Sequence, residues 1–131
     1  MIGVDTSVLV RYLVGTPSSQ ARRAAAVIDG ANDLGVPLVA LVETAHVLRT
    51  QYGVSRPDVV STLIELVTRE NLEVLGLPKA EALGALVRAR SLPGGPIADA
   101  FVAATARSAG AVPIYTFDAG LHRHGTPVAT P

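Results

Sequence analysis

The sequence predicts an α/β fold with a central, mostly parallel sheet of four to five strands. Short apolar runs alternate along the chain with longer segments whose apolar residues recur every three or four positions. The runs are predicted to be buried strands and the longer segments helices, an order typical of parallel sheets. Right-handed crossovers then place the carboxyl ends of the strands along one edge of the sheet. The length of 131 residues suits one domain, which we expect to span residues 1–131.

The first half of the chain is predicted to hold two strands and four helices. Apolar residues form a strand at Ile2–Val4, and a helical pattern follows Asp5 as far as Leu13. Proline and serine at positions 17 to 19 favour a new helix start. Ser55 is a predicted N-cap, with Pro57 in the first turn behind it. The remaining predicted segments are a helix at 21–29, a strand at Val36–Val39 and a helix from residue 40 to its stop at Gly53. The helix that Ser55 caps is predicted to extend to Val67.

The second half repeats the alternation. A strand is predicted at Leu72–Leu75 and a helix from Pro78 to Arg90, followed by the loop Leu92–Pro96, which its glycines and prolines lead us to expect to be mobile. The alanine-rich segment 97–110 is predicted to be a helix that Gly110 closes. The last predicted segments are a strand at 111–116, a turn at 117–121 and a short edge strand at 127–129.

Composition limits the classes of protein that the chain can represent. Aromatic residues are 4% of the chain, so the core is expected to be aliphatic, and charged residues are 17%, which leaves apolar surface for a partner to cover. Eleven basic and eleven acidic residues give no net charge that would attract nucleic acid at long range. Without cysteine there is no disulfide and no thiolate metal site. No apolar run reaches the ~20 residues of a membrane helix, and we expect a cytoplasmic protein without a membrane partner.

Acidic residues stand where the predicted strands end and the helices that follow them begin. Asp5 and Asp118 end or directly follow strands, whereas Glu43 lies early in a helix that follows a strand. Asp99 begins the helix after the Gly/Pro loop. In a parallel sheet these four side chains converge on one edge, where ligands of α/β proteins collect. The other seven acids are interpreted as solvated or capping groups: Asp29, Asp33, Asp58, Glu65, Glu70, Glu73 and Glu81.

Four converging carboxylates indicate a metal site. They repel one another unless a cation or shared protons offset the repulsion. Hard oxygen ligands without cysteine or a histidine pair select Mg²⁺ or Mn²⁺, and such ions suit phosphate-ester hydrolysis. Structural interpretations remain open for each acid: Asp5 as a helix cap, Glu43 and Asp99 as favourable charges near helix N-termini, and Asp118 as a turn residue. An acid among apolar neighbours is costly without a partner, which favours one shared site.

Four motifs in order resemble those of PIN-domain ribonucleases, specifically the VapC toxins of type II toxin–antitoxin pairs. They cover nearly the whole chain: VDTSVLVRYL at 4–13, ALVETAHVL at 40–48, IADAFVAATARSAGA at 97–111 and YTFDAGL at 115–121. The resemblance implies a three-layer α/β/α sandwich and metal-dependent endonuclease cleavage of RNA. It implies that the metal ligands and catalytic residues are Asp5, Glu43, Asp99 and Asp118, supported by the hydroxyl residues Thr6, Ser7 and Thr116.

The same resemblance implies partners. VapC toxins are homodimers that a cognate VapB antitoxin inhibits, in heterotetramers or larger complexes, and their substrates are RNAs such as tRNA, rRNA or mRNA. The chain departs from the family pattern at two places: Ala119 stands where a basic residue often follows the last acid, and Pro96–Ala98 lack the hydroxyl often found before Asp99. Neither departure touches the four acids.

Arginines are the expected contacts to RNA phosphates, because a guanidinium binds phosphate through two hydrogen bonds. The candidates are Arg11, Arg88, Arg90 and Arg123, although each taken alone is more readily interpreted as an ordinary surface arginine. The three histidines, His46, His122 and His124, are assigned no catalytic role.

Other functions stay open from the sequence. A haloacid-dehalogenase-like phosphatase needs a second aspartate where Ser7 stands, and a receiver domain needs a late lysine, whereas Lys79 is the only one. A PIN nuclease that processes RNA without being a toxin, and a PIN-like binding module that has lost catalysis, both remain compatible with the pattern. A measurement of divalent-metal binding tests the binding module, and growth arrest on expression distinguishes a toxin from an RNA-processing nuclease.

Overall fold

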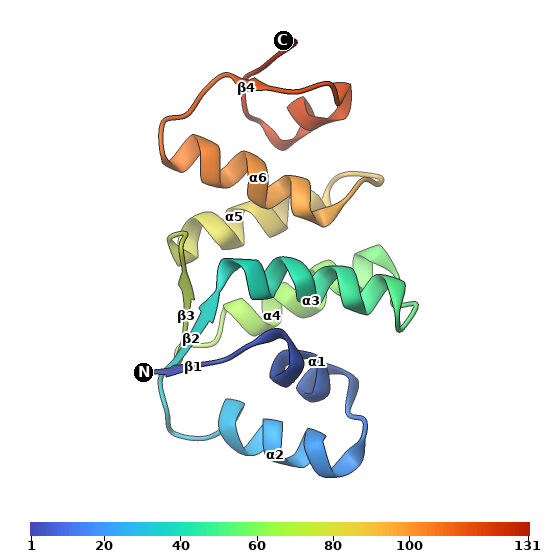
Figure 1. Cartoon of the computed structure of the whole chain (residues 1–131), viewed down its shortest axis with the longest axis vertical. Helices are drawn as coiled ribbons and strands as arrows, with labels where there is room; N and C mark the ends of the chain where they lie inside the picture. Colours follow the sequence, from blue (N-terminus) through green and yellow to red (C-terminus); the bar gives the residue numbers. More distant parts are fainter.

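Helices and strands alternate along the whole chain in the computed structural model, which describes residues 1–131 (Figure 1). The first half contains β1 (Ile2–Gly3), α1 (Thr6–Val14), α2 (Ser18–Ile28), β2 (Leu34–Pro37), α3 (Leu38–Thr50) and α4 (Arg56–Val67). The second half contains β3 (Leu72–Leu75), α5 (Lys79–Arg90), α6 (Ile97–Ser108), β4 (Ile114–Tyr115), the 3₁₀ helix η1 (Ala119–His124) and β5 (Val128–Ala129). The predicted α/β class is confirmed.

The strands are parallel, as predicted, but they form two sheets. One has the order β1-β2-β3, with Leu34 paired to both Ile2 and Leu72, and the other joins β4 to β5. The sequence predicts a single sheet of four to five strands. Backbone amides in and just after β4 bond to the segment of β5 instead: Ile114 N donates to the Pro127 carbonyl (2.8 Å) and Thr116 N to that of Ala129 (3.0 Å).

Two segments differ from the sequence prediction for local reasons. The second strand begins at Leu34 and ends at Pro37, two residues before the predicted bounds, because α3 starts directly after Pro37 and takes Leu38 and Val39 into its first turn. Proline is tolerated at such a junction because its fixed φ and missing amide suit a helix start. The predicted turn at 117–121 is the beginning of η1, which continues to His124.

The hydrophobic core is aliphatic, as the composition predicts. It joins 25 buried residues, of which Phe101 is the one aromatic, and its largest fully buried side chains include Leu34, Leu41 and Leu63. Figure 1 shows the helices in tiers, with α1 and α2 at one end, α3 to α6 between, and η1 with β4 at the other end. No helix has the length and apolar character needed to cross a membrane.

A buried arginine anchors the loop between α5 and α6. Arg56, which is 8% exposed, donates Nε to the Gly95 carbonyl (3.0 Å) and Nη1 to the carbonyls of Ala89 (2.8 Å) and Leu92 (3.1 Å). Its Nη2 is buried without a hydrogen-bond partner, and no carboxylate pairs with it. The loop predicted from glycine and proline is therefore attached to the start of α4, and this attachment fixes where α6 begins.

Candidate active site

Asp5 lies at the junction of β1 and α1, where its side chain caps the helix. One carboxylate oxygen, Oδ1, accepts hydrogen bonds from Ser7 Oγ (2.7 Å) and from the Val8 amide (3.2 Å). These bonds, that of Ser7 first, lower the pKa of Asp5 below its ordinary value. Capping and ligand binding do not exclude each other here, because the second oxygen makes no hydrogen bond within the protein. Thr6 makes no side-chain contact of this kind.

Glu43 and Asp99 carry carboxylates that have no hydrogen-bond or ion-pair partner. Glu43 is exposed in the second turn of α3, and Asp99 is half-buried in the first turn of α6. α3 and α6 pack against each other, and Glu43 lines a groove whose opposite wall includes Ile97 and Ala98, the two residues before Asp99. The two acids thus lie on neighbouring helix turns, with their oxygens free to bind a ligand.

Asp118 precedes η1 and is held by local bonds. Its Oδ1 accepts from the Gly120 amide (2.8 Å), and its own amide donates to Thr116 Oγ1 (2.9 Å). The segment that follows is attached to α5 and α6, because Arg88 donates to the His124 carbonyl (3.0 Å) and Arg107 to Thr126 Oγ1 (2.9 Å). These contacts fix the position of Asp118 relative to α6.

His124 ends η1, which packs against α6. This imidazole is buried, and its Nδ1 has no hydrogen-bond partner. Burial lowers the pKa of His124, while the negative charges of Asp99 and Asp118 both act on it in the opposite direction. Packing of η1 on α6 thus brings both carboxylates, together with Arg56 and Arg88, within electrostatic range of one buried ring.

The acids form a series of neighbours and not one cluster. Glu43 lies across the groove from the turn that carries Asp99, and Asp99 and Asp118 act on the same histidine. Asp5 begins α1, which packs on α3, whereas η1 lies at the opposite end of the molecule from α1 and α2 (Figure 1). No three acidic or histidine side chains come close enough together to hold a metal ion.

The carboxylates of these residues have the chemistry that a hard divalent cation requires, but the four are not close enough together to bind one ion jointly. Carboxylate oxygens are the ligands that Mg²⁺ and Mn²⁺ prefer, and those of Glu43 and Asp99 are unengaged. Mg²⁺ commonly binds through one or two carboxylates and keeps several waters. A pair such as Glu43 and Asp99 satisfies that requirement in kind, and a ligand set of all four acids would need them closer together.

The arginines expected to bind phosphate occupy different settings. Arg11 donates Nε to Gln20 (2.9 Å) and lines a hollow of about 490 Å³ between α1 and α2. Arg88 holds the His124 carbonyl, and Gly125 lies so close to it that a side chain there would meet the guanidinium. Arg90 and Arg123 are exposed and make no side-chain hydrogen bond.

Two arginines near the groove were not singled out from the sequence. Arg49 lines the groove that starts at Glu43, and Arg56 lies behind the loop that leads into α6. Arg49 follows Glu43 by six residues on one helix, a spacing that the sequence already contains. The burial of Arg56 has no such signal, because arginine is ordinarily exposed.

The comparison with protein families settles what kind of domain this is. The model of the PIN domain family matches residues 2–126, which is nearly the whole chain. The chain belongs to the PIN domain family. PIN domains are generally nucleases that use divalent metals, so this PIN domain is assigned to hydrolysis of nucleic acid. Its parallel strands and flanking helices agree with the α/β/α fold of the family. Comparisons with curated proteins and with solved structures give no match.

Proposed function

We propose that this PIN domain is a Mg²⁺- or Mn²⁺-dependent endoribonuclease, and that it acts as a VapC-like toxin inhibited by a VapB-like antitoxin. The observation that carries the proposal is the match to the PIN family over residues 2–126, together with acids at the four motif positions. RNA as the substrate, the toxin role, the homodimer and its heterotetramer with antitoxin rest on the likeness of the four motifs to those of VapC proteins.

The acids have defined tasks in this proposal. Asp5, Glu43, Asp99 and Asp118 hold the ion, with Ser7, Thr6 and Thr116 in support. A bound divalent ion supplies an acidified water and stabilises charge on the transferring phosphoryl group. The hydrogen bond from Ser7 keeps Asp5 ionised, and the unengaged carboxylates of Glu43 and Asp99 need no internal bond to be broken before they bind.

The experiment is a cleavage assay of purified protein on total RNA in Mg²⁺, in Mn²⁺ and in EDTA. Asp99→Asn removes one charged ligand and keeps the shape of the side chain. Glu65→Gln is the matched control, because Glu65 is an exposed acid of α4 without side-chain contacts. We expect discrete fragments that require metal, a loss of at least about 100-fold in Asp99→Asn, and no change in Glu65→Gln; loss of an outer-shell partner alone costs about 10- to 100-fold. Equal cleavage by Asp99→Asn would refute the site.

The toxin role has its own test. Expression of the wild-type chain in a bacterium is expected to arrest growth, and Asp99→Asn is expected to relieve the arrest at the same protein level. Growth arrest that persists in Asp99→Asn would separate toxicity from the nuclease site. A nuclease without any effect on growth would favour an RNA-processing role.

A binding module without catalysis is the second candidate. The observation in its favour is that no three acidic or histidine side chains gather closely enough to hold a metal ion. Calorimetric titration with Mg²⁺ and Mn²⁺ distinguishes the two, since a nuclease site binds the ion and loses that binding in Asp99→Asn. No binding by the wild-type chain, together with no cleavage, would favour the module.

A further inference from the structure

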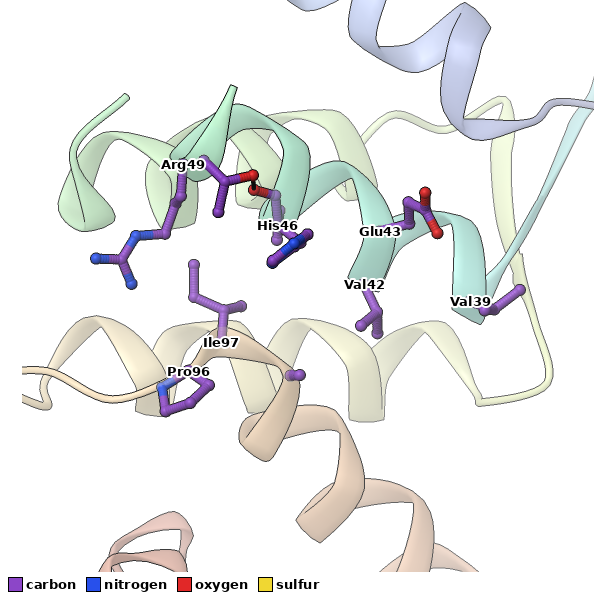
Figure 2. A pocket seen from close by; sticks show the side chains of 10 residues that line it. Val39, Val42, Glu43, His46, Arg49, Pro96 and Ile97 are labelled. Atoms are coloured by element: carbon purple, nitrogen blue, oxygen red, sulfur yellow. Dashed lines mark hydrogen bonds between the residues drawn. The ribbon is translucent and has the colours of Figure 1, made fainter. Parts of the chain in front are cut away.

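A groove of about 560 Å³ runs between α3 and the first turn of α6 (Figure 2). Its volume lies within the roughly 300–1,000 Å³ of ligand sites in proteins. Glu43 lies at one end and Arg49 at the other, with His46 between them on the same face of α3. Pro96 and Ile97 form the opposite wall (Figure 2). The groove therefore leads from a candidate metal ligand to a guanidinium.

The arginine end of the groove carries positive charge that nothing in the chain neutralises. Arg49 is exposed and belongs to neither of the two ion pairs of the structure, which are Arg69–Asp29 and Arg107–Glu81. Arg56 lies behind this end, bound to the carbonyl of Gly95 directly before the groove residue Pro96. Burial, and then the charge of Arg49, lower the pKa of Arg56. Two guanidiniums that repel each other and lack a carboxylate are stabilised by a bound anion.

Two further features raise the positive potential near this end of the groove, and Arg56 does so without lining it. The Nη2 group of Arg56 is buried and has no hydrogen-bond partner. Helix α6 has 12 residues, and no side chain caps its N-terminus at Pro96, so its first amides are free of side-chain acceptors. A helix N-terminus attracts anions through these amides and through the helix dipole, and the charge of Asp99 in the same turn opposes that attraction unless a cation is bound there. Phosphate is the anion that a nuclease substrate brings.

The middle of the groove suits a flat, weakly polar group. His46 projects from α3 toward Pro96 and Ile97, with Val42 beside it on the same helix (Figure 2). Ala45 also lines the groove. Nucleic acid bases stack on histidine and aliphatic side chains when they leave their helical stack. Residues 43 and 49 are six apart on α3, about 9 Å along the helix axis at 1.5 Å per residue.

We propose that this groove binds a single-stranded segment of the substrate beside the cut, with Arg49 on a phosphate and His46 stacked on an unpaired base. The inference rests on the proposed nuclease function and adds to it two positioning residues, Arg49 and His46, for the substrate strand. A paired strand does not fit the groove in this way, because its bases are stacked on one another and cannot enter between His46 and Ile97. Arg56 contributes its charge from behind the loop without touching the strand.

The first test measures binding without metal or cleavage. A short fluorescein-labelled single-stranded RNA is titrated with protein in EDTA at several salt concentrations, and anisotropy gives the dissociation constant. Arg49→Gln is expected to weaken binding about five-fold and to reduce the slope of log K against log salt by about 0.7, the effect of one lost phosphate contact on a single strand. Arg22→Gln removes the same charge from an exposed part of α2 and is the control. Equal slopes for wild type and Arg49→Gln would overturn the proposal.

The second test concerns the base. His46→Ala is expected to weaken binding of the single strand by about five-fold or more, and His46→Phe to restore it, since phenylalanine keeps a stacking surface. A fully paired duplex of the same sequence is expected to bind weakly and to show no dependence on residue 46. Loss of binding in both variants, or an equal dependence in the duplex, would contradict stacking.

Failure of this inference is distinguishable from failure of the proposed function. Metal-dependent cleavage by the wild-type chain with unchanged KM and salt slope in Arg49→Gln would refute the groove and leave the nuclease standing. Binding that depends on Arg49 and His46 in a chain that never cleaves would support the groove and refute the nuclease. In an active enzyme the two variants are expected to raise KM with kcat nearly unchanged, because the residues hold the strand away from the reacting atoms.

Discussion

Replacing Arg56 with methionine tests how the loop before α6 is held in place. Methionine keeps much of the side-chain volume and removes three hydrogen bonds, of 3.0, 2.8 and 3.1 Å, to the carbonyls of Gly95, Ala89 and Leu92. A hydrogen bond that involves a charged group contributes about 1.5–3 kcal/mol. The substitution also removes a buried charge and the unsatisfied Nη2, whose desolvation costs about 1–3 kcal/mol.

The expected net effect on the free energy of unfolding is a loss of about 2–3 kcal/mol. It is smaller than the three bonds suggest because the Ala89 carbonyl keeps the Leu92 amide (3.1 Å) as a partner, and Gly95 is exposed to water. For a chain of this length each 1 kcal/mol shifts the melting temperature by roughly 4 °C, so we expect a decrease of about 10 °C.

Thermal and urea unfolding followed by circular dichroism measure this change. Arg22→Met is the control, because Arg22 is exposed and makes no side-chain contact, and it is expected to stay within about 0.5 kcal/mol of wild type. A melting temperature of Arg56→Met equal to or above that of wild type would refute the reasoning. In that case the cost of burying an unpaired guanidinium would be as large as its three bonds are favourable, as happens for some buried ion pairs.

Two further predictions concern the core and its pH dependence. Leu63 is 0% exposed, and Leu63→Ala is expected to lower the free energy of unfolding by about 2–5 kcal/mol, whereas Leu63→Met is expected to lower it by less than about 1.5 kcal/mol. Both changes are measured as shifts of the urea midpoint at constant m. Equal effects would indicate that the surrounding core collapses into the cavity left by alanine. Burial holds the pKa of His124 below its ordinary value of 6.5. The stability linked to this group is therefore present above pH 6.5 and is lost as the pH falls through the folded-state pKa, because the unfolded chain binds the proton first. Melting temperatures between about pH 8 and pH 5 are expected to fall less in His124→Gln than in wild type, and parallel curves would assign the acid dependence to other groups.

Local patterns predict much of this fold because they act within a few residues. Ser55 is a helix cap as predicted, and Asp5 forms the cap that its sequence position left open as one interpretation, with bonds to the amides of Asp58 and Val8 respectively. The strand at Leu72–Leu75 has its predicted bounds. The division of the sheet is not contained in such patterns, because β4 pairs with β5 through bonds between residues that lie 13 apart in the chain. Short strands of two residues have too little apolar periodicity to specify a partner.

The candidate site shows the same limit. The position of each acid at the end or start of an element could be predicted, since strand ends and helix starts have local signals. The distances between the acids depend on how α1, α3, α6 and η1 pack, which the sequence alone does not give. The arginines illustrate the difference: Arg88, a predicted phosphate contact, holds a backbone carbonyl, whereas Arg49 lines the groove. Only tertiary structure separates an arginine that is engaged from one that is free.

The brevity of the outer strands has a consequence for association between copies of the chain. β1 and β4 are two residues long, and each pairs with a neighbour on one side only. An incoming strand would find at most two residues of unpaired backbone there, too short a ladder to hold a foreign chain or to exchange a strand between subunits. β5, the other strand of the second sheet, is equally short, and the longer outer strand β3 presents Glu73 to solvent, a charge that opposes pairing of like edges. Self-association would therefore use side-chain surfaces and not backbone pairing of strands, so that surface substitutions can abolish it without disturbing the sheet.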